Sequence, residues 1–283
     1  MLKRGVRLVV PRRLVVGTIA LALAVTTGCG SSSLASSAGT FKPAHPGTLT
    51  VATAFLPSPG FWEGDVTAPS GGFERDLAYA LAKRFGLPSV AVVPVAFGDL
   101  VTGHLGGADV ALSELTPTAE RSKVLDFTTP YLIAPPGVVV RPGNEPRDLA
   151  ALRGLRWVTV TGSTLTHVVN DVIRPDHHAM EVAGRPDALA AIDSGQAQAM
   201  LLDLPVALAL AKAMPDRYKV AAQLSGSEGL AAALPHGSKN SEAVDSAIRA
   251  FLADGTIARL SERWLGADLA TQANDVPLIR TLE

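Results

Sequence analysis

The sequence predicts an α/β protein built from two lobes. Apolar, strand-like runs alternate with helical patterns over residues 49–112, and the same alternation returns over residues 157–213. A strand–helix–strand order of this kind implies parallel strands joined by right-handed crossovers. The 283-residue chain is also long enough for two compact lobes once an N-terminal leader is set aside.

The first lobe is predicted from five segments. Phe73, Leu77, Leu81 and Phe85 recur at helical spacing, which indicates a helix with one apolar face. A Pro/Gly-rich loop over residues 55–70 precedes this helix. The predicted segments are a strand at Leu49–Thr53, a helix at Phe73–Phe85, a strand at Val90–Val95, a short helix at Leu100–Leu105 and a strand at Val110–Leu112.

The second lobe repeats this logic after a first connection over residues 134–140. A strand at Trp157–Val160 runs into Thr161–Thr164 and a helix, and free N–H groups at such a helix start favour an anion. A second strand ends at Asp203. Helices are predicted on either side of this strand, at Ala188–Gly195 and Val206–Ala213.

The chain closes with three further segments after the second lobe. They are a return strand at Leu230–Leu234 and two helices at Ser241–Ala253 and Ile257–Leu265.

The N-terminus has the features of an export leader. An apolar run, Leu14–Val25, follows a basic start and ends shortly before Cys29. A dozen apolar residues are too few to span a bilayer but suit a signal peptide. Cys29 has no second cysteine to pair with, and small residues precede it, so residues 1–28 are predicted to be a lipoprotein signal peptide and Cys29 to be lipidated. An incidental thiol is the alternative reading, and the Arg12–Arg13 pair leaves Sec and twin-arginine export both open.

The expected mature chain is acidic. Removal of residues 1–28 leaves 255 residues and takes away five of the 25 Lys and Arg, so 20 basic residues stand against 26 acidic ones, a formal net charge of −6. This balance argues against nucleic acid or an anionic membrane as the partner. Residues 29–46, rich in Ser, Ala, Gly and Pro, are predicted to form a flexible tether.

The segment from Asp109 to Leu132 is the most informative part of the chain. Arg121 follows the third predicted strand, and ligands of parallel sheets bind beyond the carboxyl ends of the strands. The planar fork of an arginine suits a carboxylate, because it donates two parallel hydrogen bonds. Taken alone, the pattern favours a surface arginine in a polar loop.

This segment resembles the signature of the family 3 bacterial extracellular solute-binding proteins, the polar amino-acid receptors of ABC importers. The resemblance extends over about residues 47–266 and includes the closing run from Asp254 to Gly266. It implies a type II periplasmic-binding fold, with residues 47–135 and 228–283 in lobe 1, residues 136–227 in lobe 2, and a two-segment hinge. The signature positions are Asp109, Val110, Thr116, Thr118, Arg121, Asp126, Phe127, Thr128, Pro130 and Tyr131.

The resemblance also implies roles for individual residues. Arg121 corresponds to the ligand for an α-carboxylate, and Asp203 to the ligand for an α-ammonium. Thr116 and Thr164, with Ser163 beside it, correspond to hydroxyls around the same end of the ligand. From its position alone, Asp203 fits a helix N-cap better, and the resemblance reverses that order.

Two features of the predicted site stay open at this level. Family members place a first-loop aromatic against the ligand, and Phe61 and Trp62, with Phe55, are the candidates here, although core packing fits them too. Glu114 stands where the family usually has Gly, Ser or Ala. We hypothesise that it enters the pocket and favours ligands with extra positive charge. The alternatives are that it turns to solvent, or that it pairs with Arg121 in an open form.

The motifs of common enzymes are absent from the sequence. It holds no G-x-S-x-G, Walker A or G-x-G-x-x-G pattern, and adjacent His177 and His178 suit a solvated loop better than a metal site. We therefore expect no metal and no cofactor. The expected partners of a monomer are an amino acid, a permease–ATPase complex and, through the lipid, the membrane. A small dehydratase of the cyclohexadienyl type is the alternative. The identity of the amino acid, and whether the location is a Gram-positive surface or a periplasm, are left open.

Overall fold

The computed structural model describes residues 40–54, 56–65, 68–226, 228–266 and 269–281. The predicted signal peptide, Cys29, most of the predicted tether and Phe55 lie outside the described residues. Residues from Ser37 onward form one compact unit. Among the helices of the described part, none is long and apolar enough to cross a bilayer.

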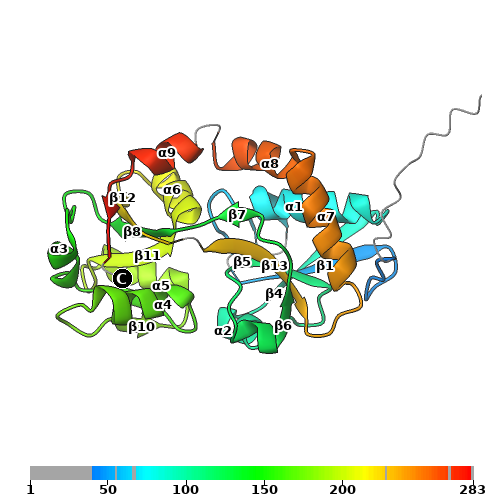
Figure 1. Ribbon diagram of the computed structural model, residues 1–283, viewed down its shortest axis with the longest axis horizontal. Coiled ribbons are helices and arrows are strands. Elements are labelled where there is room, and N and C mark those ends of the chain that lie inside the picture. Colours follow the sequence, from blue (N-terminus) through cyan, green and yellow to red (C-terminus); the bar gives the residue numbers. More distant parts are fainter. Residues whose placement is uncertain (1–39, 55, 66–67, 227, 267–268, 282–283) are drawn as a thin grey trace, which may run out of the picture. The chain divides into compact units, whose positions relative to one another are not determined.

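In the described part of the chain, six strands form the first sheet: β1 (Thr48–Thr53), β4 (Ser89–Pro94), β5 (Val110–Leu115), β6 (Leu125–Phe127), β7 (Leu132–Ile133) and β13 (Gly229–Pro235). The order is β4–β1–β5–β13–β6, with β7 paired to β13 (Figure 1). β1 is parallel to β4 and β5, as predicted, whereas β13 is antiparallel to β5 and β6. The predicted return strand is thus confirmed as the fourth strand in this order.

Helices cover this sheet and fix its core. α1 packs against β1, β4 and β5, and its buried face includes Phe73, Leu77 and Leu81 at the predicted spacing. A short hairpin from the first loop lies beside α1. These elements are α1 (Phe73–Arg84), α2 (Phe97–Val101), α7 (Ser241–Ala253), α8 (Thr256–Trp264), and the hairpin strands β2 (Glu63–Gly64) and β3 (Pro69–Gly71).

The second sheet consists of β8 (Pro136–Val140), β11 (Ala199–Asp203), β12 (Lys219–Leu224) and β14 (Leu278–Ile279), in the order β11–β8–β12–β14. A parallel pair, β9 (Val158–Val160) and β10 (Met180–Val182), joins it through a bridge between Trp157 and Ala199. β8 is antiparallel to β11 and β12. The second sheet is therefore mixed, where the repeated strand–helix pattern suggested parallel strands.

The helices of the second lobe pack around this sheet (Figure 1). α6 contacts β8, β11 and β12, whereas α5 contacts β9 and β10. A π-helical turn continues α4 over Val168–Ile173. The helices are α3 (Leu149–Arg153), α4 (Thr164–His167), α5 (Arg185–Asp193), α6 (Leu204–Ala213) and α9 (Leu269–Asp275).

The chain crosses between the sheets more often than predicted. It passes from β7 to β8 and returns from β12 to β13, as a two-segment hinge requires. Residues 228–283 were expected wholly in lobe 1, but Leu278–Ile279 pair with β12 in the second sheet. Gln223 fixes this tail, because its Nε2 donates to the carbonyls of Ala273 (2.6 Å) and Val276 (2.9 Å).

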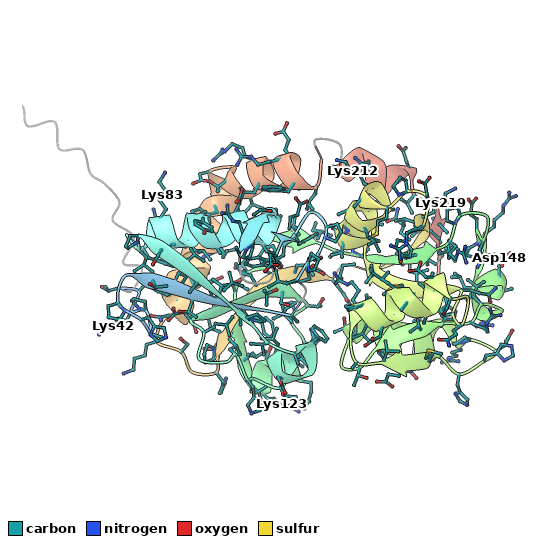
Figure 2. All side chains as sticks on the ribbon, turned by 180° about the vertical axis from the view of Figure 1, so that it is seen from behind. Lys42, Lys83, Lys123, Asp148, Lys212 and Lys219 are labelled. Atoms are coloured by element: carbon teal, nitrogen blue, oxygen red, sulfur yellow. The ribbon has the colours of Figure 1, made fainter. Side chains whose placement is uncertain are left out.

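Charge is distributed unevenly between surface and interior. Figure 2 shows labelled side chains such as Lys42, Lys83 and Lys123 at the periphery, and all three residues are exposed. Arg121 and Arg185, by contrast, are only 7% and 9% exposed. Charged side chains are rarely buried without a partner, so these two arginines draw attention to the region between the sheets.

Candidate functional site

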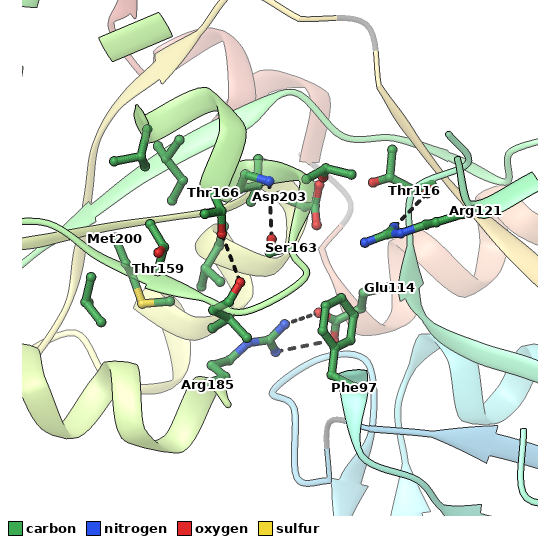
Figure 3. Close-up of a pocket in the computed structure, with 17 residues that line it drawn as sticks. Phe97, Glu114, Thr116, Arg121, Thr159, Ser163, Thr166, Arg185, Met200 and Asp203 are labelled. Carbon is green, nitrogen blue, oxygen red and sulfur yellow. Dashed lines mark hydrogen bonds and ion pairs between the residues drawn. The ribbon is translucent and has the colours of Figure 1, made fainter. Parts of the chain in front are cut away.

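A pocket lies where the two lobes meet, and side chains from both lobes line it (Figure 3). The cavity measures about 40 Å³, room for roughly three water molecules at about 10–15 Å³ each. Its polar and aromatic lining includes Phe97, Glu114, Thr116 and Arg121 from the first lobe and Ser163, Thr164, Arg185 and Asp203 from the second.

Arg121 is held at the pocket wall by main-chain carbonyls. It begins a 3₁₀ turn, Arg121–Lys123, directly beyond β5. Its Nη1 donates to the carbonyl of Thr116 (2.7 Å), and its Nη2 donates across the lobes to the carbonyl of Gly162 (3.0 Å). Burial lowers the pKa of Arg121, and the carboxylates of Asp203 and Glu228 oppose that shift. The burial of this side chain does not fit a solvated surface arginine.

Asp203 faces the same pocket from the other lobe. It ends β11 and stands at the N-cap position of α6, yet its side chain makes no capping hydrogen bond. Its Oδ1 is buried and has no hydrogen-bond partner among the described residues. Burial and the nearby carboxylate of Glu114 raise the pKa of Asp203 to about 8, although Arg185 and Arg121 pull it down. A cationic ligand group beside Asp203 would stabilise its ionised form and lower its pKa.

The predicted hydroxyl residues also lie at this pocket. Thr116 is buried, and its carbonyl is one of the two acceptors for Arg121. Ser163 caps α4, because its Oγ accepts from the N–H of Leu165 at 3.2 Å. Thr164 is the first residue of α4 and lines the cavity. The structure therefore brings together Arg121, Asp203 and the three hydroxyl residues.

Glu114 enters the pocket and pairs with a residue that the sequence analysis did not single out. Its carboxylate forms an ion pair with Arg185 and accepts a hydrogen bond from the hydroxyl of Ser58 at 2.6 Å. Arg185 Nη1 also donates to Ser58 Oγ at 2.9 Å. Glu114 has a φ of 51°, a left-handed conformation that is unusual for a residue with a side chain. A glycine would adopt this conformation freely.

A second buried carboxyl group, that of Glu74, bonds the main chain of Glu114. Glu74 accepts three hydrogen bonds: from Tyr131 Oη (2.5 Å), from Trp62 Nε1 (2.8 Å) and from the N–H of Glu114 (2.7 Å). Burial, and then the charge of Glu114, raise the pKa of Glu74 to about 8, while these donors lower it. Glu74 thereby fixes the main chain of Glu114.

The first-loop aromatics within the described residues, Phe61 and Trp62, are core residues. Phe61 and Trp62 are fully buried and do not line the pocket. A tight turn between Ser58 and Trp62 folds this loop inward, and the Trp62 indole bonds Glu74. The aromatic on the wall is Phe97, which lies 5.7 Å from the Arg121 guanidinium. The expectation that Phe61 or Trp62 contacts a ligand thus differs from where the fold places them.

One feature of the sequence could have identified Arg185 as a functional residue. It stands in the first turn of α5, between Gly184 at the N-cap and Pro186. A cation there opposes the helix dipole, so an arginine at this point needs an anion from elsewhere in the fold. Among the described residues no group of His, Cys, Asp and Glu is arranged to hold a metal ion.

Comparison with known proteins identifies the class of this chain. The model of the bacterial extracellular solute-binding proteins, family 3, matches residues 57–267. The chain therefore belongs to this family, and the resemblance seen in the sequence is confirmed.

The relatives include binding proteins and an enzyme. The chain is 29% identical over 255 residues to the L-cystine-binding protein of Escherichia coli (strain K12), covering 88% of this chain and 94% of the relative. An ancestral arginine-binding protein bound to glutamine is 30% identical, with a TM-score of 0.69 and coverage of 78% and 99%. The membrane-bound lytic murein transglycosylase F of Ectopseudomonas mendocina is 28% identical, but the match covers only 51% of that enzyme. The structural likeness confirms the type II periplasmic-binding fold.

Proposed function

We propose that this protein is the extracytoplasmic substrate-binding component of an ABC importer, and that it captures a polar amino acid between its lobes. One observation supports this most directly. Arg121 from lobe 1 and Asp203 from lobe 2 line one pocket, and Asp203, whose pKa is about 8, becomes the opposite charge when it ionises. A zwitterionic ligand carries a carboxylate for the arginine and an ammonium for the aspartate, so it binds both lobes at once.

The placement of the other groups supports the same function. Thr116, Ser163 and Thr164 supply hydroxyls and N–H groups beside Arg121, which suit a carboxylate. The two crossing segments allow the lobes to separate and close, as hinged binding proteins do around a ligand. The named relatives bind L-cystine, or arginine and glutamine, and these names make an amino acid the ligand class to test first.

A thermal-shift screen with the protein amino acids and L-cystine tests the proposal, with isothermal titration calorimetry on every hit. At least one amino acid should raise the melting temperature and bind with one-to-one stoichiometry. Multiple-turnover assays with prephenate and arogenate should show no product, because we propose a receptor and not a dehydratase. Failure of all amino acids to bind would overturn the proposal.

We also propose that Cys29 anchors the exported protein through lipid and that a permease–ATPase complex receives its ligand. The support for the anchor is the basic, apolar and small-residue succession before the cysteine. Mass spectrometry of the native product should find Cys29 as the modified N-terminal residue. An unmodified cysteine, or cleavage at another site, would contradict the anchor without affecting the ligand proposal.

A further inference from the structure

The ion pair of Glu114 and Arg185 joins the two lobes inside the pocket. Glu114 is the penultimate residue of β5 in the first lobe, and Arg185 begins α5 of the second. The side chains are 1% and 10% exposed. Ser58 bonds both partners, so the cluster is a three-residue network that exists only when the lobes are together.

This pair sets the charge of one side of the pocket. A carboxylate and a guanidinium in contact cancel at short range, and each keeps the other from being a lone buried charge. Both residues line the same cavity as Arg121 and Asp203. Figure 3 shows Glu114 and Arg185 in contact within this pocket. An amino acid that engages Arg121 and Asp203 through its backbone groups would bring its side chain beside this pair, where the charges cancel.

We propose that Glu114 and Arg185 are specificity-determining residues that select amino acids whose side chains are polar but carry no net charge. This replaces the hypothesis that Glu114 favours ligands with extra positive charge, because Arg185 already balances its carboxylate. A basic side chain meets Arg185, and an acidic one meets Glu114, so either is repelled by its like charge and must separate the pair to bind. A neutral polar side chain bonds to the pair and leaves it intact. This inference rests on the proposed amino-acid receptor function.

Replacing Glu114 and replacing Arg185 should shift the ligand preference in opposite directions. With Glu114 replaced by glycine, Arg185 adds one positive charge to the pocket, which favours an acidic side chain. With Arg185 replaced by methionine, Glu114 adds one negative charge, which favours a basic side chain. Glycine also suits the left-handed backbone at position 114.

Two pairs of nearly isosteric ligands separate charge from size: L-glutamine with L-glutamate, and L-citrulline with L-arginine. Calorimetry at pH 7 should show that the wild type prefers a neutral member over its charged counterpart by at least about tenfold. Glu114→Gly should reverse the first preference, Arg185→Met should reverse the second, and the double variant should lose both. Arg249→Ala, at an exposed ion pair on α7, is the matched control and should leave the ranking unchanged.

Circular dichroism melting establishes that each variant is folded, and Glu114→Gln replaces Glu114→Gly if that variant is not. The inference is overturned if the wild type prefers a charged member of either ligand pair, or if every amino acid that it binds has a charged or an apolar side chain. It is also overturned if the rankings of folded variants match the wild type. Binding of no amino acid by the wild type would instead overturn the proposed function.

Discussion

The two sets of opposite charges in the pocket differ in what they contact. Glu114 and Arg185 satisfy each other and share Ser58. Arg121 and Asp203 have no hydrogen bond to each other: the arginine donates to carbonyls, and the buried Oδ1 of the aspartate has no partner among the described residues. A buried carboxyl oxygen without a partner destabilises the folded protein by about 1–3 kcal/mol or more.

This difference separates binding from selection. Arg121 and Asp203 do not bond each other, so the guanidinium and carboxyl groups can both engage a ligand, which suits recognition of groups shared by all amino acids. The charges of Glu114 and Arg185 are paired with each other, which suits discrimination among ligand side chains. Substitutions in the first set should therefore abolish binding, and substitutions in the second should redirect it.

The largest effect is expected from Arg121→Ala. Loss of one partner of a desolvated charge pair costs about 2–5 kcal/mol, so affinity for the best ligand should fall by a factor of roughly 30 or more. Asp203→Ala should have a similar effect through the ammonium. Calorimetry and melting curves together make the measurement, with Arg249→Ala as the control. Unchanged affinity in a folded variant would remove that residue from the site, and unchanged affinity in both would erase the distinction between the two sets.

A pH dependence follows from Asp203. Its pKa of about 8 reflects burial and Glu114, against Arg185 and Arg121, with Glu228 also facing it. An ammonium ligand binds the ionised carboxyl group, so binding should release a proton and affinity should rise from about pH 6 to pH 8. Calorimetry in buffers of different ionisation enthalpy measures the proton. Asp203→Asn should abolish its release, whereas release that persists in this variant would assign the proton to another group.

The same shift has a consequence for the protein without ligand. Because the folded-state pKa of Asp203 is raised from 3.8 to about 8, the unfolded chain loses its proton first as pH rises. The contribution of Asp203 to the free energy of unfolding therefore falls between about pH 4 and pH 8, and it is constant outside that window. Chemical denaturation of wild type and Asp203→Asn across this range should converge at low pH.

Local patterns in the sequence predicted the elements that lie near the site. The helical spacing of Phe73, Leu77 and Leu81, and the strand before Arg121, depend on local periodicity and were confirmed. The family resemblance predicted that Arg121 and Asp203 lie at the same ligand. Arg185 could not be placed in this way, since it lies 71 positions from Glu114 in the sequence and meets it only where the two lobes approach each other. The tail strand β14 was missed because two residues give no periodic signal.

The network behind Glu114 gives a smaller expected effect. Glu74→Gln presents an amide N–H₂ where the carboxyl group accepts from Tyr131, Trp62 and Glu114. The resulting donor conflict should lower the free energy of unfolding by about 1–3 kcal/mol. Trp62→Phe removes one donor and should cost less. Affinity should change far less than in Arg121→Ala, because Glu74 does not line the pocket. A loss of binding as large as that of Arg121→Ala would show that the network belongs to the binding set.

The smallest effect is expected at Ser163. Its Oγ accepts from the N–H of Leu165, and the loss of such a cap costs about 1 kcal/mol of stability. Ser163 follows Gly162, whose carbonyl accepts from Arg121, so the turn also positions the acceptor that joins the lobes. Ser163→Ala should therefore lower affinity for every bound amino acid by less than about tenfold, without changing their order. A changed order, measured by calorimetry on the isosteric ligand pairs, would place Ser163 with Glu114 and Arg185 rather than with Arg121 and Asp203.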